Sequence, residues 1–297
     1  LRPIFNYGYL GVQIFFVISG FIIPYSLYKS NYKINIFPKF ILKRYIRIAP
    51  TAWVSIAIMM AFYWLPVLLF NKFISVTNPA NFSLHNIPAN LLFLTPFLQS
   101  NWIISVLWTL NIEFQFYLFI GFFFPLLMGK KGVLYFIIVF FSLSGLFYKL
   151  IAGYNYNGEV VFATYIFYHA PLFCIGIVTF LYKIKKISVF EYIYGMLLFF
   201  VIGLFTMNHI NEIIAGLLSA LFILFIHYSN PVSDFFGNIS YSLYLNHLVF
   251  IVYIDAIFRQ IFPRTNNILA NLFLITVFYL IIFLGSWFFY NIVERYF

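Results

Sequence analysis

About nine runs of some twenty mostly apolar residues follow one another along this chain. A helix that rises ~1.5 Å per residue needs about 20 residues to cross the ~30 Å hydrocarbon core of a bilayer. Of the 297 residues, 64% are hydrophobic and only 8% are charged, far from the balance of a soluble domain. The sequence therefore predicts an all-α polytopic membrane bundle of about nine transmembrane helices, forming a single domain over residues 1–297. The runs lie at about 8–28, 50–70, 105–127, 132–152, 163–182, 190–208, 211–228, 239–258 and 268–290.

Basic residues are concentrated in alternate connections between these runs. They gather within 29–49, at 130–131 and at 183–186, whereas the opposite connections hold only Lys72, Arg259 and Arg264. Because cytoplasmic loops carry the excess of Lys and Arg, this pattern places 29–49 in the cytoplasm and Leu1 outside the cell. The net charge of +10 is explained by this orientation, so nucleic acid is not an expected partner.

Cysteine and metal-ligand patterns exclude two classes of site. The single cysteine, Cys174, lies in an apolar run, so neither a disulfide framework nor a thiol metal site is expected. The chain has no HExxH motif, no Cys/His pairing and no carboxylate cluster, and we expect no metal site.

The longest outer connection, 71–104, contains the apolar piece Asn86–Gln99. This piece is too short to cross a bilayer, and it holds Pro88 and Pro96. We expect it to be re-entrant or interfacial rather than a further span.

One carboxylate, Glu113, lies inside the apolar run LWTLNIEFQFYL at 107–118. An ionisable side chain at membrane depth costs between ~2.5 and more than ~10 kcal/mol unless it meets protein partners or water. At 100° per residue, Thr109 and Tyr117 share the helix face of Glu113, while Asn111 and Gln115 lie on the opposite side. A helix that is polar on two sides belongs inside a bundle. Glu113 is then either a functional group or an interhelical hydrogen-bond anchor.

Two arginines, Arg44 and Arg47, form the pattern RYIR on one face of a short amphipathic helix predicted between Pro38 and Pro50. Guanidinium groups bind phosphate bidentately, so this face suits a phosphorylated ligand at the cytoplasmic surface. The alternative is a topology anchor that also attracts anionic lipid.

The eighth run also carries a polar stripe. Ser240, Tyr244, His247 and Asp255 project within about 80° of one another. His247 and Asp255 are roughly 12 Å apart along the axis, so they do not form a directly bonded acid–base pair. A histidine well inside a span needs a polar partner or water, and His247 is a candidate for function on that ground.

Two further features suit helix packing. Gly8, Gly11, Ser19 and Gly20 form a small-residue surface on which another helix can approach closely. For His169, which opens YHAPLF in the fifth run, structural hydrogen bonding is favoured over a role in lining a cavity.

Four segments occur in a familiar order: GYLGVQIFFVISGFII at 8–23, FPKFILKRYIRIAP at 37–50, LWTLNIEFQFYLF at 107–119 and ISYSLYLNHLVF at 239–250. Together they resemble the membrane-bound acyltransferase 3 family, which O-acylates cell-surface glycans. Members of that family typically have ten spans. In the family, the first span carries an Arg and, further along, a His proposed as the catalytic base. This chain begins after that point, so we expect it to be N-terminally incomplete and inactive alone unless such a span precedes Leu1.

The resemblance implies roles for four residues. Arg44 and Arg47 match an Arg-x-x-Arg pattern thought to engage acyl-CoA on the cytoplasmic side. Glu113 matches an intramembrane Glu expected to orient or charge-balance a catalytic group. His247 matches the His after the Ser-Tyr-x-x-Tyr run and is expected to line a tunnel between the two membrane faces.

The implied function is that of an integral O-acyltransferase of the bacterial cytoplasmic membrane. It would move an acetyl or similar group from acyl-CoA, most simply acetyl-CoA, to a sugar hydroxyl of a cell-surface glycan or lipid-linked sugar. Its partners would be these two substrates and membrane lipids, with no metal. The alternatives are a transporter or exporter of a glycan or small solute, since buried ionisable groups also mark transport paths, and an inactive acyltransferase fragment.

Overall fold

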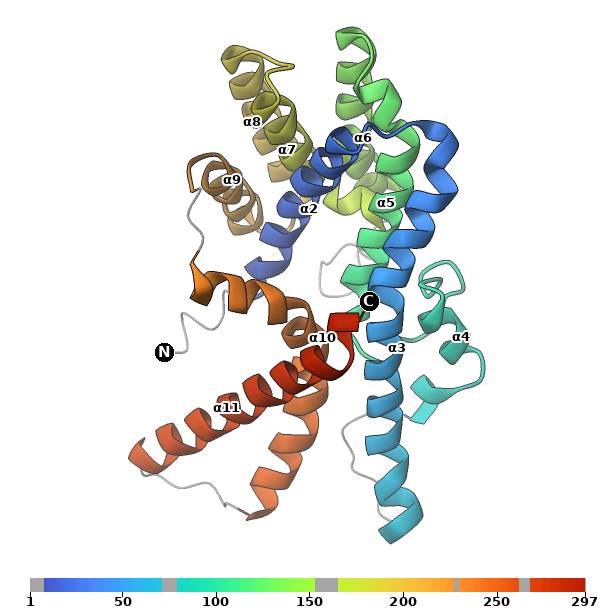
Figure 1. Cartoon of the computed structure of the whole chain (residues 1–297), viewed down its shortest axis with the longest axis vertical. Coiled ribbons are helices and arrows are strands. Elements are labelled where there is room, and N and C mark those ends of the chain that lie inside the picture. The colour runs from blue at the N-terminus through green and yellow to red at the C-terminus, as the bar shows by residue number, and fades with distance from the viewer. Residues whose placement is uncertain (1–7, 71–78, 153–164, 227–229, 262–267, 297) are drawn as a thin grey trace. The chain divides into compact units, whose positions relative to one another are not determined.

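The computed structural model describes residues 8–70, 79–152, 165–226, 230–261 and 268–296, with backbone alone at 65–70, 79, 152, 252, 254–261 and 268–272. These residues form helices and turns without a strand (Figure 1). The helices are α2 Leu10–Lys29, α3 Phe37–Phe70, α4 Asn86–Leu91, α5 Leu107–Leu127, α6 Lys131–Ala152, α7 Ile166–Lys183, α8 Val189–Thr206, α9 Ile210–Phe225, α10 Pro231–Ile261 and α11 Ile268–Ile292. Three 3₁₀ turns accompany them, η1 Ile34–Ile36, η2 Pro79–Phe82 and η3 Glu294–Tyr296.

The described part of each apolar run predicted from the sequence falls largely within one helix. Among the described residues, seven helices are long and apolar enough to cross a membrane: α2, α3, α5, α6, α7, α8 and α11. The helix α9 is apolar but shorter, with 16 residues, and α10 has 31 residues that include several polar ones. The prediction of an all-α polytopic membrane bundle is confirmed.

Helix contacts divide the chain into two compact units. Unit 1 comprises Leu1–Leu42 and Ile112–Tyr228, and unit 2 comprises Lys43–Asn111 and Ser229–Phe297. The long helices α3 and α5 each contribute residues to both units.

Unit 1 is built around α7, which packs against α2, α6, α8 and α9. Nearly every side chain of α7 between Ile166 and Leu181 is buried. The backbones of α2 and α7 meet at Gly20 and Gly176, where a Cβ on Gly20 would lie 3.1 Å from the Cα of Gly176. Of the predicted small-residue surface, Gly20 allows the close approach of another helix, whereas Gly11 has open space around it. Without a hydrophobic driving force in lipid, such close backbone approach supplies much of the attraction between helices.

Unit 2 is held together by hydrogen bonds between α3 and α10. The hydroxyl of Ser55 donates to Asn246 Oδ1 at 2.9 Å, and the Tyr241 hydroxyl donates to the Ile48 carbonyl at 2.9 Å. Farther along, α10 packs against α11. Polar pairs of this kind remove the cost of leaving a donor or acceptor unsatisfied in an apolar surrounding.

The segment that carries RYIR differs from its prediction. It does not end at Pro50, because α3 runs without interruption from Phe37 to Phe70. A proline removes one helix hydrogen bond, but transmembrane helices tolerate this loss where neighbouring groups support the backbone. Here the Tyr241 hydroxyl of α10 donates to the carbonyl of Ile48, two residues before Pro50.

The apolar piece at 86–99 folds as the six-residue helix α4 followed by turns, far too short for a span. Asparagines hold it in place. The Asn90 side chain donates to the Asn101 carbonyl at 2.9 Å and accepts from the Ile103 N–H at 3.1 Å. From α3, the Trp53 indole donates to the Leu91 carbonyl at 2.9 Å. These side chains replace the helix or sheet bonds that this stretch of backbone lacks.

Candidate functional site

Glu113 lies on the buried part of α5, with only 7% of its surface exposed. The hydroxyl of Tyr117, one helical turn later, donates to its carboxylate at 2.5 Å. This bond confirms that the two side chains share one helix face, as the i, i+4 spacing predicts. It also supplies one of the hydrogen bonds that a carboxylate at this depth requires.

The opposite face of α5 is polar and buried as well. Asn111 donates to the Phe93 carbonyl at 2.6 Å within unit 2. In unit 1, the side-chain oxygen of Gln115 accepts from the N–H of Ile166 at 3.0 Å, which satisfies a first-turn donor of α7. Both polar faces of α5 therefore make hydrogen bonds to protein, as the sequence predicts for a helix that is polar on two sides.

His247 is half-buried on α10. Its Nδ1 lies 2.5 Å from the carbonyl oxygen of Tyr244 on the preceding turn. Because a carbonyl only accepts, Nδ1 carries the proton, and Nε2 is the acceptor nitrogen of the neutral ring. In that tautomer only Nε2 can take a proton or a hydrogen bond from a ligand.

The predicted stripe on α10 is assembled only in part. Tyr244 lies beside His247, and its hydroxyl is 2.5 Å from the Thr109 hydroxyl of α5. Ser240 is exposed and bonds the Gly237 carbonyl of its own helix. The side chain of Asp255 lies outside the described residues.

Arg44 and Arg47 both lie on α3 in unit 2, with Arg44 half-buried and Arg47 exposed. The charge of Arg47 acts on the carboxylate of Glu294, which follows α11. That carboxylate also accepts a hydrogen bond from the Ser242 hydroxyl of α10. An anionic ligand at Arg47 would therefore compete with an acidic side chain that the sequence analysis did not single out.

Two buried polar contacts lie outside the predicted site residues. In unit 2, Asn246 is fully buried, accepts from Ser55 and donates to the Ser242 carbonyl at 3.1 Å. In unit 1, Gln13 of α2 donates to the carboxylate of Glu212 on α9 at 3.0 Å. The sequence pattern could have indicated both contacts, because their polar residues lie inside apolar runs, as Glu113 does.

The surroundings of Glu212 are polar on several sides. The main-chain N–H of His209 donates to its carboxylate, and the charge of Lys149 acts on it. Among the described residues, the Oε1 atom of Gln13 has no hydrogen-bond partner. His169 is also buried in unit 1, where its ring packs against Phe16 with centroids 4.7 Å apart.

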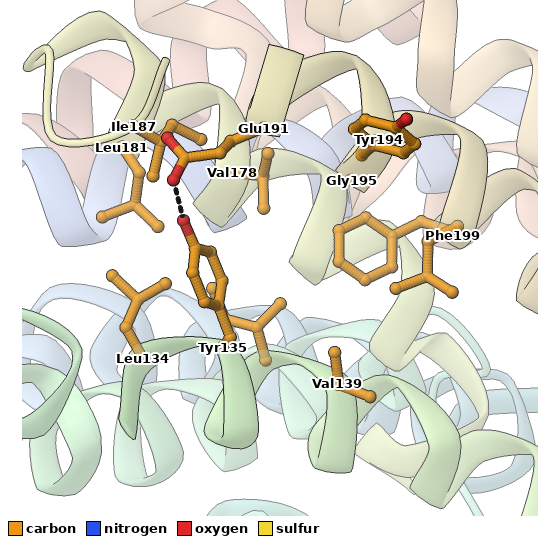
Figure 2. A pocket seen from close by; sticks show the side chains of 12 residues that line it. Leu134, Tyr135, Val139, Val178, Leu181, Ile187, Glu191, Tyr194, Gly195 and Phe199 are labelled. Atoms are coloured by element: carbon orange, nitrogen blue, oxygen red, sulfur yellow. Dashed lines mark hydrogen bonds between the residues drawn. The ribbon is translucent and has the colours of Figure 1, made fainter. Parts of the chain in front are cut away.

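A cavity of about 420 Å³ opens between α6, α7 and α8. Figure 2 shows Tyr135 and Glu191 facing each other at one end, with Val139 and Phe199 farther along. None of the residues predicted to carry chemistry lines it. Within the described ranges, no three His, Cys, Asp or Glu side chains gather into a group that could hold a metal ion.

Comparison with known protein families shows to which class this chain belongs. The family described as Acyltransferase domain matches residues 3–291, almost the whole chain. The chain belongs to the acyltransferase 3 family. It is therefore an integral membrane protein of an acyltransferase family, and Arg44, Arg47, Glu113 and His247 all lie inside the matched range. A search of curated proteins gives no match, and neither does a search of solved structures.

Proposed function

We propose that this acyltransferase moves an acetyl or similar group from a cytoplasmic acyl-CoA to a sugar hydroxyl of a cell-surface or exported glycan, in a bacterial cytoplasmic membrane. The observation that carries the proposal is the family match over residues 3–291. Units 1 and 2 act in it as one catalytic domain. The donor is acetyl-CoA in the simplest case, and the acceptor is a glycan or lipid-linked sugar.

The donor is held through its phosphates by Arg44 and Arg47. Their guanidinium groups lie on a helix that continues into a span, so a phosphate bound there stays next to the membrane. Arg47 is exposed and can reach a soluble ligand, while the half-buried Arg44 is the more restrained of the pair. Arginine suits this task because its planar donors match two phosphate oxygens at once.

The chemistry is attack of the sugar oxygen on the thioester carbonyl. A base takes the hydroxyl proton as the new C–O bond forms, and polar groups stabilise the negative charge on the tetrahedral oxygen. The C–S bond then breaks, and the CoA sulfur leaves with the proton as the free thiol. Glu113, whose carboxylate accepts a hydrogen bond from Tyr117, orients the base that takes the hydroxyl proton or balances its charge. His247 lines the acyl path and presents Nε2, since Nδ1 bonds the Tyr244 carbonyl.

The donor assignment is tested by binding of a non-transferable acetyl-CoA analogue to purified protein. The double variant Arg44→Ala/Arg47→Ala should lower the affinity at least tenfold, because two charge-assisted contacts contribute about 1.5–3 kcal/mol each. The matched control is Lys29→Ala/Lys33→Ala, which removes two positive charges from the same predicted cytoplasmic segment. Equal affinity in the two folded variants would return the arginines to a role as topology anchors.

The reaction itself is tested by O-acetylation of surface polysaccharide in a strain without its own enzyme, with the chain expressed together with any segment that precedes Leu1 in its gene. Activity should depend on Glu113, so Glu113→Gln should lower the rate while Tyr117→Phe lowers it less. Accumulation or export of an unmodified glycan, without acylation, would support the transport function instead.

A further inference from the structure

The cavity between α6, α7 and α8 has walls that are almost entirely apolar. Leu134, Ile138 and Val139 line it from α6, Val178 and Leu181 from α7, and Leu198 and Phe199 from α8. Its volume of about 420 Å³ falls within the ~300–1,000 Å³ of typical ligand sites. The cavity opens to the outside of unit 1, because Tyr194 of α8, one of its lining residues, is 74% exposed. An apolar chain can enter such a cavity directly from the bilayer.

One end of the cavity is polar and rigid. The carboxylate of Glu191 accepts from the Tyr135 hydroxyl at 2.5 Å and from Lys131 Nζ at 2.9 Å. It also accepts from the N–H of Ser188, which completes a capping box at the start of α8. Lys131 remains 55% exposed. Since an ammonium group has three N–H donors, Lys131 can bind a further anion while it bonds Glu191.

Positive charge is in excess at this end of the three helices. Five lysines, at 130, 131, 183, 185 and 186, lie in or beside the connections before α6 and after α7, and Lys131 pairs with the carboxylate of Glu191. Lys186 Nζ donates to the Met128 carbonyl at 2.6 Å, so the connection after α7 lies against the connection before α6. Burial and the nearby charge of Lys131 lower the pKa of Lys186 below its usual value. An anion placed here would relieve repulsion between ammonium groups.

The apolar walls and the lysines at one end together indicate which kind of ligand fits this cavity. A soluble anion would leave the apolar cavity unfilled, and an uncharged lipid would leave the lysines unmatched. We propose that the cavity binds an acyl chain of an anionic phospholipid, with the lipid phosphate against Lys131. Clusters of lysine at the membrane surface attract anionic headgroups, and the cavity adds a defined place for one chain. The site uses none of the residues assigned to acyl transfer, so it stands or falls separately from that function.

The test counts lipids retained by the purified full chain. Protein reconstituted in equal amounts of phosphatidylglycerol and phosphatidylcholine is extracted into mild detergent and examined by native mass spectrometry. The wild-type chain should retain one phosphatidylglycerol. Gly195→Leu should lose it, because this side chain starts 3.1 Å from Val178 Cγ1 and grows into the cavity. The matched control is Gly132→Leu on α6, where a Cβ meets open space.

Removal of the headgroup partner should act differently from filling the cavity. Lys131→Gln should lower the preference for phosphatidylglycerol over phosphatidylcholine about fivefold, the factor expected for one lysine near an anionic surface. Lys185→Gln, which removes an exposed lysine at the same end, should lower the preference by less than Lys131→Gln, because of these two lysines Lys131 is the one bonded to Glu191 at the cavity. If Gly195→Leu does not fold, Leu198→Trp fills the same cavity and takes its place. Equal retention of both lipids by the wild-type chain, or full retention by the cavity-filling variant, would overturn the proposal.

Discussion

Gly176→Ala is expected to destabilise this protein, although alanine is the better helix former. A Cβ on Gly176 would clash with the Val17 carbonyl oxygen and lie 2.6 Å and 2.7 Å from the C and Cα atoms of Gly20. Carbon atoms pack best at about 3.5–4.0 Å. All three atoms belong to the backbone of α2, so no side-chain rotation can make room, and α2 must move about 1 Å away from α7.

The expected change in unfolding free energy combines one favourable term and two unfavourable ones. Alanine gains up to about 1 kcal/mol in helix propensity over glycine. Overpacking a close contact typically costs about 1–3 kcal/mol. A gap of 0.5–1 Å also removes roughly a quarter to a half of each dispersion contact, and α7 is the helix on which unit 1 packs. We expect a net loss of about 1–3 kcal/mol.

Thermal unfolding of the purified protein in detergent measures this loss. The midpoint should fall by several degrees, given about 2–4 °C per kcal/mol for domains of 150–250 residues. Gly11→Ala is the control on α2, because a Cβ there meets nothing, and its midpoint should be unchanged or higher. Adding Gly20→Ala to Gly176→Ala should cost less than Gly20→Ala alone, since the helices are already apart. A Gly176→Ala midpoint at or above that of the wild type would refute the close-packing argument.

Two further predictions concern orientation and the core of unit 2. An impermeant thiol reagent on intact cells should label a cysteine at Ser83 and not one at Lys130, with little background because Cys174 is buried; the reverse pattern would overturn the orientation. A double-mutant cycle of Ser55→Ala and Asn246→Ala in thermal unfolding should give a coupling of about 0.5–1.5 kcal/mol, whereas strictly additive losses would show that this buried hydrogen bond adds no stability.

Much of the candidate site depends on local spacing and could be predicted. Glu113 and Tyr117 are four residues apart on one helix, so their hydrogen bond follows from helical geometry alone. On α10 the helical repeat alone says less. Ser240 and Tyr244 share a face of this helix, yet Ser240 is exposed while Tyr244 meets Thr109. The helical repeat predicts which residues share a face of a helix. Which part of that face is buried depends on the neighbouring helices.

The continuity of α3 shows a second limit of local reasoning. Pro50 removes a backbone donor, and in the sequence it marks a probable helix end. The helix nevertheless continues, and close to Pro50 the Tyr241 hydroxyl of α10 donates to the Ile48 carbonyl. A partner almost two hundred residues away cannot be found from the pattern around Pro50.

Which segments enter the membrane, and which of their residues share a helix face, can be predicted from the sequence, because hydropathy and the helical repeat are properties of each segment alone. Which helices pair with one another depends on contacts between segments far apart in the chain. Gln13 meets Glu212 across 199 residues, and Ser55 meets Asn246 across 191. In lipid, apolar side chains gain little by preferring another helix over the bilayer, so hydropathy carries no information about pairing. Pairing follows from close-fitting small residues such as Gly20 and from buried polar groups that must find one another.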